Sequence, residues 1–152
     1  MKLNIGCGGE RRAGFINIDV NPACQVDLVM DLPKDSLVER FGEHSVDEIY
    51  SCHAMEHMAP FIPLVLDMWR VSKPGAIWHI EVPHRDHEIG NPYHVTQFTE
   101  WTFRFFEPTA RFRYGRHTIM RGTASEMHPI KLEEIEQQRI DDSIRYLLRV
   151  VK

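Results

Sequence analysis

The sequence has few cysteines and no long apolar run. Its three cysteines, Cys7, Cys24 and Cys52, are odd in number and show no CxxC spacing. This pattern argues against a disulfide framework and against a structural zinc site. No apolar run approaches the roughly 20 residues that span a bilayer, and the first residues do not read as a signal peptide. We therefore predict a reduced, cytoplasmic, soluble protein with no membrane partner.

The chain also lacks an excess of basic charge. It carries 18 Lys and Arg residues against 22 Asp and Glu residues, for a formal net charge of −4. Without a basic stripe, nucleic acid is not an expected partner. Nine histidines are many for 152 residues, and they make the charge sensitive between about pH 5 and 7. The length predicts one domain over residues 1–152.

Residues 3–20, LNIGCGGERRAGFINIDV, organise the rest of the chain. They predict a short apolar strand, a glycine turn at residues 6–9, and a second strand that ends at Asp19. Glycines directly after a strand let the backbone approach a ligand that a Cβ would push away. An acidic residue at the end of the next strand can accept hydrogen bonds from two ribose hydroxyls. The stretch therefore predicts a nucleoside-containing cofactor across the carboxyl ends of two parallel strands.

Downstream, expected strands and helices alternate. Further strands are expected at 26–30, 46–50, 77–83, 111–120 and 143–151, and helices at 36–41, 61–71, 100–106 and 132–139. Such alternation favours an α/β fold with parallel strands at the centre of the sheet. About six residues (10–15) separate the glycine turn from the second strand, whereas a parallel crossover normally needs a dozen or more. The first crossover helix is therefore predicted to be missing or very short.

Five blocks carry a family resemblance: LNIGCGG, FINIDV, VMDLP, VDEIYSCHAMEH and WRVSKPGAIWHIEVP. In this order and spacing they resemble the class I S-adenosylmethionine-dependent methyltransferases. They are most similar to the small bacterial and phage-type members, in which a GCGG turn is followed almost directly by a G-[FW]-x-N-x-D strand. The resemblance covers about residues 3–106. It implies a Rossmann-like sheet of order 3-2-1-4-5-7-6 with strand 7 antiparallel, and S-adenosylmethionine as the cofactor.

The resemblance also implies which residues bind the cofactor. The glycine turn would pass under the methionine part, Asp19 would hold the ribose, and Asp31 would accept from the adenine amino group. Asn4 stands where the family usually has an acidic residue, and its amide can still hydrogen-bond the cofactor. The implied cofactor-binding residues are Asn4, Gly6, Cys7, Gly8, Asp19, Val20, Asp31, Leu32, Ser51, Cys52 and His53.

Methyl transfer is an in-line displacement that requires alignment and the exclusion of water. A base is needed only if the acceptor carries a proton that must leave early. The candidates for this catalytic role are His84, His94 and His53. Each could instead be a capping, buried or solvated histidine, just as Asp31 could be a turn residue and Cys52 a packing residue.

One competing interpretation is a divalent metal site in the loop after the fifth strand. Its ligands would come from His84, Asp86, His87, Glu88 and His94, which are residue types that bind such ions. Spacing within a loop fixes no geometry, so the sequence prediction assigns no metal.

The predicted function is methyl transfer to an oxygen or nitrogen of an unidentified acceptor, most simply a small molecule or a sugar-type compound. The alternative is a catalytically weak or inactive cofactor-binding subunit of a larger assembly, which the missing crossover helix and Asn4 motivate. A homodimer or a protein partner would then cover the open side of the pocket. A nicotinamide dehydrogenase fits worse, because no GxGxxG is present and the acid follows the turn by about ten residues instead of about twenty.

Overall fold

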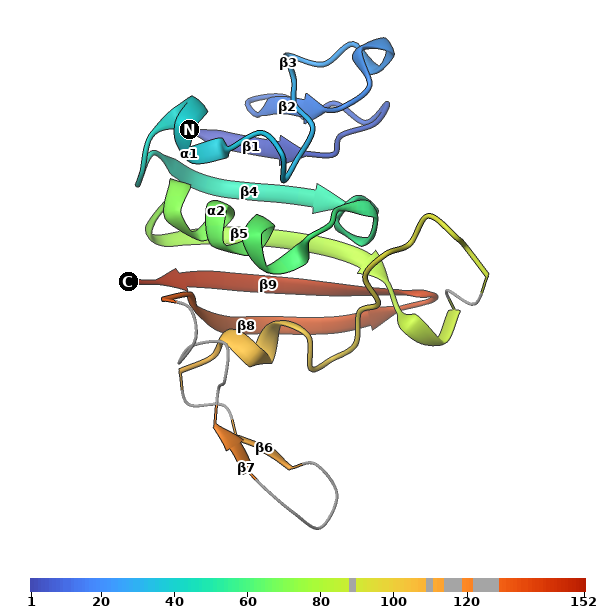
Figure 1. Cartoon of the computed structure of the whole chain (residues 1–152), viewed down its shortest axis with the longest axis vertical. Coiled ribbons are helices and arrows are strands. Elements are labelled where there is room, and N and C mark those ends of the chain that lie inside the picture. Colours follow the sequence, from blue (N-terminus) through green and yellow to red (C-terminus); the bar gives the residue numbers. More distant parts are fainter. Residues whose placement is uncertain (88–89, 109–110, 114–118, 122–128) are drawn as a thin grey trace.

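The computed structural model describes residues 1–87, 90–108, 111–113, 119–121 and 129–152. Its main sheet has the strand order β3-β2-β1-β4-β5-β9-β8 (Figure 1). The strands are β1 (Lys2–Ile5), β2 (Ile16–Asp19), β3 (Leu28–Val29), β4 (Val46–Cys52), β5 (Ser72–Pro83), β8 (Lys131–Ile140) and β9 (Ser143–Val151). Strands β1 to β5 are parallel, and β9 pairs antiparallel with both β5 and β8. The predicted order, with an antiparallel seventh strand, is confirmed.

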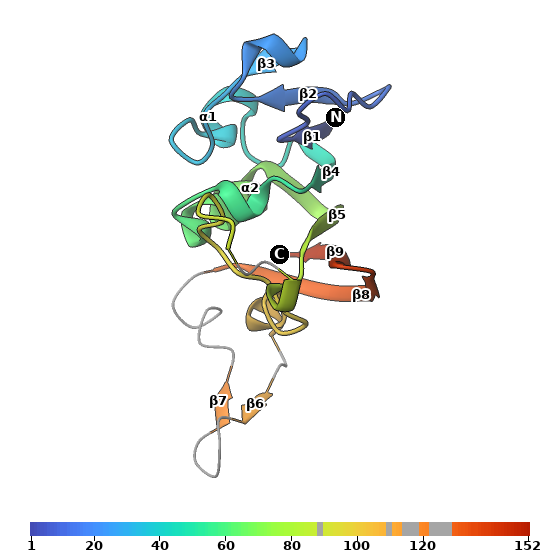
Figure 2. The same ribbon diagram turned by 90° about the vertical axis from the view of Figure 1, so that its right-hand side faces the viewer.

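The helices among the described residues lie on one face of this sheet (Figure 2). Helix α1 (Leu37–Phe41) begins after Ser36, whose Oγ accepts a hydrogen bond from the Glu39 amide over 3.2 Å, a standard N-cap. Helix α2 (Phe61–Val71) starts after Pro60, as predicted. The remaining turns are 3-10: η1 (Pro22–Cys24), η2 (Met55–His57), η3 (Arg85–His87) and η4 (Phe103–Phe106). No helix of the described residues is long and apolar enough to cross a membrane.

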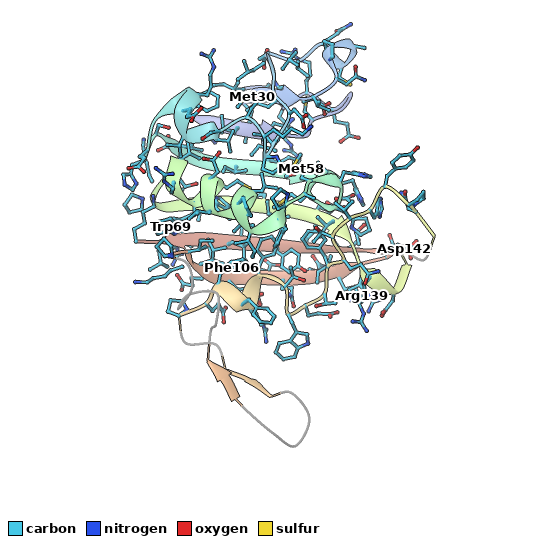
Figure 3. All side chains as sticks on the ribbon, viewed as in Figure 1. Met30, Met58, Trp69, Phe106, Arg139 and Asp142 are labelled. Carbon is cyan, nitrogen blue, oxygen red and sulfur yellow. The ribbon has the colours of Figure 1, made fainter. Side chains whose placement is uncertain are left out.

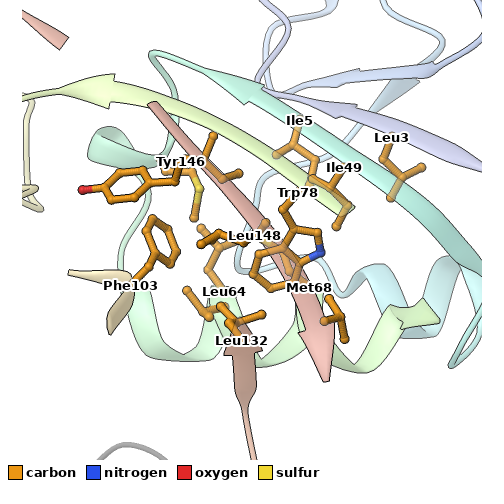
Figure 4. Packing of buried hydrophobic residues seen from close by; sticks show 14 of the residues in the cluster. Leu3, Ile5, Ile49, Leu64, Met68, Trp78, Phe103, Leu132, Tyr146 and Leu148 are labelled. Atoms are coloured by element: carbon orange, nitrogen blue, oxygen red, sulfur yellow. The ribbon is translucent and has the colours of Figure 1, made fainter. Parts of the chain in front are cut away.

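The core lies between α2 and the covered face of the sheet (Figure 4). Alternate residues of β9 are buried there, and Tyr146 stacks edge-on against Phe103 of η4 with ring centroids 4.8 Å apart. The Tyr146 hydroxyl donates to the Thr99 carbonyl over 2.6 Å. The fully buried Trp78 donates its indole N–H to Ser72 Oγ over 2.9 Å. Tyr146 and Trp78 therefore bury their polar atoms as hydrogen-bonded pairs, as a stable interior requires.

The opposite face of the sheet carries charged side chains, and no helix of the described residues covers it. Three ion pairs join residues that face each other in neighbouring strands: Lys2–Glu48 at 2.6 Å, Glu81–Arg145 at 2.6 Å and Glu133–Arg149 at 2.9 Å. Opposite charges on directly paired strand residues are mutually stabilising. This face is therefore built to meet water, and the described part of the chain is a two-layer structure.

A network of polar side chains takes the place of the first crossover helix. Residues 6–15 link β1 to β2 without a helix, which confirms the prediction. The Asn4 amide donates to Asn17 Oδ1 over 2.8 Å and to the Glu10 carbonyl over 3.0 Å. Asn17 Nδ2 donates in turn to Asp27 Oδ2 over 2.8 Å. The Arg12 guanidinium lies 3.3 Å from the centre of the Tyr50 ring, which ties the connection down onto β4.

Three elements differ from the sequence expectation. The helix expected at 100–106 is only the 3-10 turn η4, which begins after Thr102. Residues 132–139 are not a helix: they form most of β8, because pairing with β9 over nine residue pairs overrides the helical preference of Glu and Gln. The single strand expected at 111–120 is also wrong. Strands β6 (Arg111–Arg113) and β7 (Ile119–Arg121) pair with each other as a two-stranded sheet apart from the main one (Figure 1), and residues 114–118 lie outside the described ones.

Candidate functional site

A pocket of about 340 Å³ lies at the carboxyl ends of β1, β2, β3 and β4. Ligands in open α/β sheets bind at this edge, where the strand order reverses. Figure 3 labels two side chains of the lining, Met30 after β3 and Met58 after η2. The full lining is Gly6, Gly8, Ile18, Asp19, Val20, Met30, Asp31, Leu32, His53, Ala54, His57 and Met58.

The glycine turn is locked to the end of β2 by one carboxylate. Asp19 Oδ2 accepts a hydrogen bond from the Gly8 amide over 2.8 Å, and Oδ1 accepts one from the Asn21 amide over 2.9 Å. A carboxylate offers about four acceptor positions, so each oxygen keeps capacity for a further donor. Asp19 is thus held in place and can still bind two hydroxyls.

Two of the three turn glycines, Gly6 and Gly8, serve different purposes. Both have positive φ, +65° at Gly6 and +49° at Gly8. A Cβ at Gly6 would lie 2.2 Å from the Ala54 Cβ, so this position must let the segment after β4 pass close to the turn. A Cβ at Gly8 would meet nothing within 4 Å. Gly8 therefore presents bare backbone toward the pocket that it lines.

The predicted cofactor residues divide into two groups. Seven of them line the pocket: Gly6, Gly8, Asp19, Val20, Asp31, Leu32 and His53. The other four lie outside its lining: Asn4, Cys7, Ser51 and Cys52.

Of the four residues outside the lining, Asn4, Cys7 and Ser51 are buried and Cys52 is half-buried. The Asn4 side-chain amide donates its hydrogen bonds to the Glu10 carbonyl and to Asn17, not to the pocket. Burial raises the pKa of the Cys7 thiol, and the Asp19 charge adds to the effect. Burial also raises the pKa of the Cys52 thiol. Ser51 is fully buried, and its hydroxyl has no hydrogen-bond partner among the described residues.

Five lining residues were not among the predicted cofactor-binding residues: Ile18, Met30, Ala54, His57 and Met58. Met30 directly precedes the predicted Asp31, so its position after a strand was a usable signal. Ala54 was less visible, because only its approach to Gly6 reveals its role.

Asp31 is already paired within the pocket wall. Its Oδ2 accepts from Lys34 Nζ over 2.5 Å, and its amide donates to Asp35 Oδ2 over 2.7 Å. The Asp31 carboxylate raises the pKa of Lys34 in return. A ligand amino group at Asp31 would therefore share the carboxylate with this exposed lysine.

The structure brings two of the three predicted catalytic histidines to the pocket. His53 lines it, in a left-handed conformation with φ of +48°, and its amide donates to the Glu81 carbonyl over 2.9 Å. His94 lies against the lining residue His57, with ring centroids 4.6 Å apart.

His84 is placed differently. Its side chain is buried, its Nε2 lies 3.2 Å from Glu100 Oε2, and its Nδ1 accepts from the Asp86 amide over 3.2 Å. It is not part of the pocket lining. The residues of the alternative metal site predicted in this loop do not come together. Asp86 lies beside His84, whereas His94 lies beside Glu56 and His57. Glu88, a further member of that predicted site, lies outside the described residues, as does the side chain of His87.

Glu56 is a buried acid next to the lining residue His57. Its side chain is 1% exposed, and burial raises its pKa against the opposing effect of His57, His53 and His94. It lies within 4 Å of two imidazoles, His53 Nδ1 at 3.7 Å and His57 Nε2 at 3.9 Å from Oε1.

A larger hollow of about 440 Å³ lies on the open face of the sheet, over Tyr50, His79 and Arg145. Its charged groups are engaged with one another, as in the pair Glu81–Arg145 and the 3.3 Å contact of His79 Nε2 with Glu48. It lacks the glycine turn and the strand ends that shape the smaller pocket. We therefore take the smaller pocket as the functional site.

Neither a protein-family model nor a curated protein sequence matches the chain. Solved structures do. A SAM-dependent methyltransferase from Aquifex aeolicus matches with a TM-score of 0.61 and 13% identity, over 99% of this chain and 81% of that one. The 1,6-didemethyltoxoflavin-N1-methyltransferase of Burkholderia thailandensis, with bound 1,6-didemethyltoxoflavin and S-adenosylhomocysteine, matches with a TM-score of 0.59 and 14% identity, over 99% and 71%.

A third match comes from a complex between the Haloferax volcanii Trm112 methyltransferase activator and a methyltransferase. Its TM-score is 0.62 at 14% identity, over 99% of this chain and 82% of that one. At these identities the likeness concerns the fold. The chain has the seven-stranded Rossmann-like fold of the class I methyltransferases, with few helices.

Proposed function

We propose that the chain binds S-adenosylmethionine in this pocket and transfers its methyl group to an oxygen or nitrogen of an acceptor. The observation that carries the proposal is the Asp19 carboxylate, fixed at the end of β2 by the Gly8 amide and facing a pocket at the strand ends. This is the position and chemistry that a ribose requires in such sheets.

The lining fits a nucleoside cofactor in four respects. The pocket volume of about 340 Å³ lies within the usual range for small-molecule sites. Gly8 presents backbone where a side chain would occupy space. Asp31 offers a carboxylate to an adenine amino group at the end of the neighbouring strand. Met30 and Met58 supply apolar, polarisable walls.

The cofactor, when bound, supplies a methyl group on a positively charged sulfur. The residues of this chain align that group with the acceptor and exclude water. We assign His53 as the group that takes the acceptor proton, because it lines the pocket. His94 remains a candidate beside His57. We assign His84 a positioning role, since its ring is buried against Glu100 and Asp86.

We propose a small-molecule or sugar-type acceptor. In the described part of the chain, no helix or insert covers the pocket and could bind a large substrate. The Burkholderia thailandensis structure contains a small heterocycle. We also assign residues 1–152 to one domain. We group it with the small bacterial and phage-type methyltransferases on its GCGG turn and short β1–β2 connection.

A cofactor-binding subunit of a larger assembly is the second candidate. The helix-free connection between β1 and β2 favours it, because residues 9–15 contribute nothing to the pocket lining. The Haloferax volcanii structure is of a complex with an activator. In this case a partner would complete the pocket.

Both candidate functions require the chain to bind the cofactor, and melting curves with S-adenosylhomocysteine test this binding. A ligand that binds only the native state raises the melting temperature by mass action. Radiolabelled S-adenosylmethionine offered with pools of small metabolites then separates them. Label transfer supports the enzyme, and its loss in His53→Ala with retained S-adenosylhomocysteine binding supports the assigned role. Binding without transfer, together with a stable co-purified partner, favours the subunit. No shift in melting temperature at millimolar ligand contradicts both.

A further inference from the structure

Three side chains converge beside the pocket, and the proposed methyl transfer gives them no joint role. Glu56, His57 and His94 each present one ligand-type atom, and these atoms lie within 4.8 Å of one another. Two imidazoles and one carboxylate form a common ligand set for divalent transition metals. Glu56 and His57 come from η2, and His94 comes from a loop far along the chain.

Backbone hydrogen bonds hold that loop against η2. The amides of Val95 and Thr96 both donate to the Glu56 carbonyl, over 2.8 Å and 3.2 Å. The Tyr93 carbonyl lies 3.1 Å from His57 Nδ1. The three contacts fix His94 beside its partners.

The same contacts orient the His57 ring. With Nδ1–H donating to the Tyr93 carbonyl, the lone pair of His57 lies on Nε2, the nitrogen on the Glu56 side. Metal-binding histidines almost always donate their second nitrogen to a carbonyl or carboxylate in this way. The Asn91 Nδ2 lies 2.8 Å from His94 Nε2, and the Asn91 Oδ1 accepts a hydrogen bond from the Tyr93 amide over 3.1 Å. A metal bound to His94 would therefore displace this side-chain amide or turn it over.

Glu56 supplies an independent sign of a ligand. Its side chain is 1% exposed, and its Oε2 has no hydrogen-bond partner among the described residues. A buried carboxylate oxygen without a partner is costly, and buried charges are normally paired or bound to metal. A cation bound through both carboxylate oxygens, Oε1 on the imidazole side and Oε2, would remove the cost.

The spacing suits a small ion. Zinc bonds of about 2.0–2.2 Å place tetrahedral ligand atoms about 3.4 Å apart. Glu56 Oε1 lies 3.9 Å from His57 Nε2 and 3.7 Å from His53 Nδ1. The ligand atoms of Glu56, His57 and His94 lie within 4.8 Å of one another, so side-chain rotations would bring them to coordinating distance. His53 is a third imidazole near the carboxylate.

We propose that Glu56, His57 and His94 form a binding site for one divalent transition-metal ion, a site that the sequence does not predict. A second cluster, Cys52, His53 and Glu81, is the weaker candidate, because the Glu81 carboxylate already pairs with Arg145 over 2.6 Å. If the proposed methyl transfer is right, an ion beside the lining residue His57 would polarise an acceptor oxygen next to the methyl group.

Titration with metal ions tests the site directly. The full-length protein, stripped with a chelator and dialysed, is titrated with Zn²⁺ by calorimetry and with Co²⁺ by visible absorption. The expected result is one ion per chain, with a Co²⁺ spectrum of imidazole and carboxylate ligation. No saturable binding at millimolar metal by folded protein would overturn the proposal.

Variants locate the ion. Glu56→Gln keeps the shape of the side chain and removes its charge, so it should fold and weaken binding at least about tenfold, as should His57→Ala. His79→Ala is the matched control, since His79 lies on the open face away from the cluster, and it should bind as the wild type does. Undiminished binding in Glu56→Gln, or loss of binding only in Cys52→Ser, would contradict the assignment.

Binding of S-adenosylhomocysteine is measured on the same samples. Metal binding with no response to S-adenosylhomocysteine would leave the metal site standing and refute the proposed cofactor. The opposite result would refute the metal site alone.

Discussion

The backbone amide of Gly8 donates a hydrogen bond to Asp19 Oδ2 over 2.8 Å. This contact joins the turn after β1 to the end of β2, although no helix links the two strands. Because the carboxylate is anchored before any ligand arrives, it needs little reorganisation on binding. The pair therefore defines the geometry of the pocket.

The glycine turn should respond differently at its two positions. Gly6→Ala places a Cβ 2.2 Å from the Ala54 Cβ and forces a left-handed alanine, so we expect it to destabilise the protein by about 2–5 kcal/mol. Gly8→Ala meets no atom within 4 Å and should cost only the backbone strain, about 1–2 kcal/mol. Its methyl group would occupy the pocket and weaken S-adenosylhomocysteine binding.

Gly14→Ala is the control for Gly8→Ala. Gly14 also has positive φ and open surroundings, but it does not line the pocket. Urea denaturation and calorimetry should show a similar loss of stability with unchanged binding. Equal loss of binding in both variants would mean that the effect at Gly8 is strain rather than obstruction.

Asp27 should contribute stability at neutral pH that is lost in acid. Hydrogen bonds from the Asn17 amide and side chain, and then from Arg11, lower the pKa of Asp27 to about 2. The unfolded-state pKa of an Asp is about 3.9. The unfolded chain therefore takes up a proton first, and stability falls as pH drops from about 4 toward 2. Asp27→Asn should lower stability at pH 7 and reduce this acid slope in urea titrations. A slope equal to that of the wild type would show that Asp27 is not anchored in solution.

Tyr146 should oppose stability at alkaline pH. Burial raises its pKa, so above pH 10 the unfolded state releases a proton that the folded state keeps, and stability falls as pH rises. Tyr146→Phe should remove this loss. At pH 7 it should cost about 1 kcal/mol through the missing bond to the Thr99 carbonyl. Denaturation at pH 7 and 10.5 measures both effects, and an unchanged alkaline slope would refute the prediction.

The sheet order was predictable because five sequence blocks resemble, in their order and spacing, those of the class I methyltransferases. Strand β9 could also be predicted from its local sequence, because its buried residues alternate with outward-facing ones. The buried residues are Ile144, Tyr146, Leu148 and Val150. Strand β8 was not predictable in the same way. Its Glu- and Gln-rich sequence favours a helix, and only its partner in the sheet makes it a strand.

Site residues could be predicted where a single residue has a recognisable position in the sequence. They could not be predicted where their role depends on a contact between residues far apart in the chain. Asp19 and the turn glycines follow from their positions at strand ends. Asn4 does not line the pocket, because its partner Asn17 lies on another strand and no local signal shows that pairing. The meeting of Glu56 with His94 depends on a loop that folds back over η2, which spacing along the chain cannot reveal.

Calorimetric titration of S-adenosylhomocysteine into the wild type and Asp19→Asn tests the central claim most directly. Asp47→Asn, at the opposite end of β4 and outside the pocket, is the control. We expect saturable binding to the wild type and to Asp47→Asn. Affinity should be at least about tenfold weaker in Asp19→Asn, because a charged acceptor for ribose hydroxyls contributes about 1.5–3 kcal/mol. Absence of binding to the folded wild type, or equal affinity in all three proteins, would contradict the account.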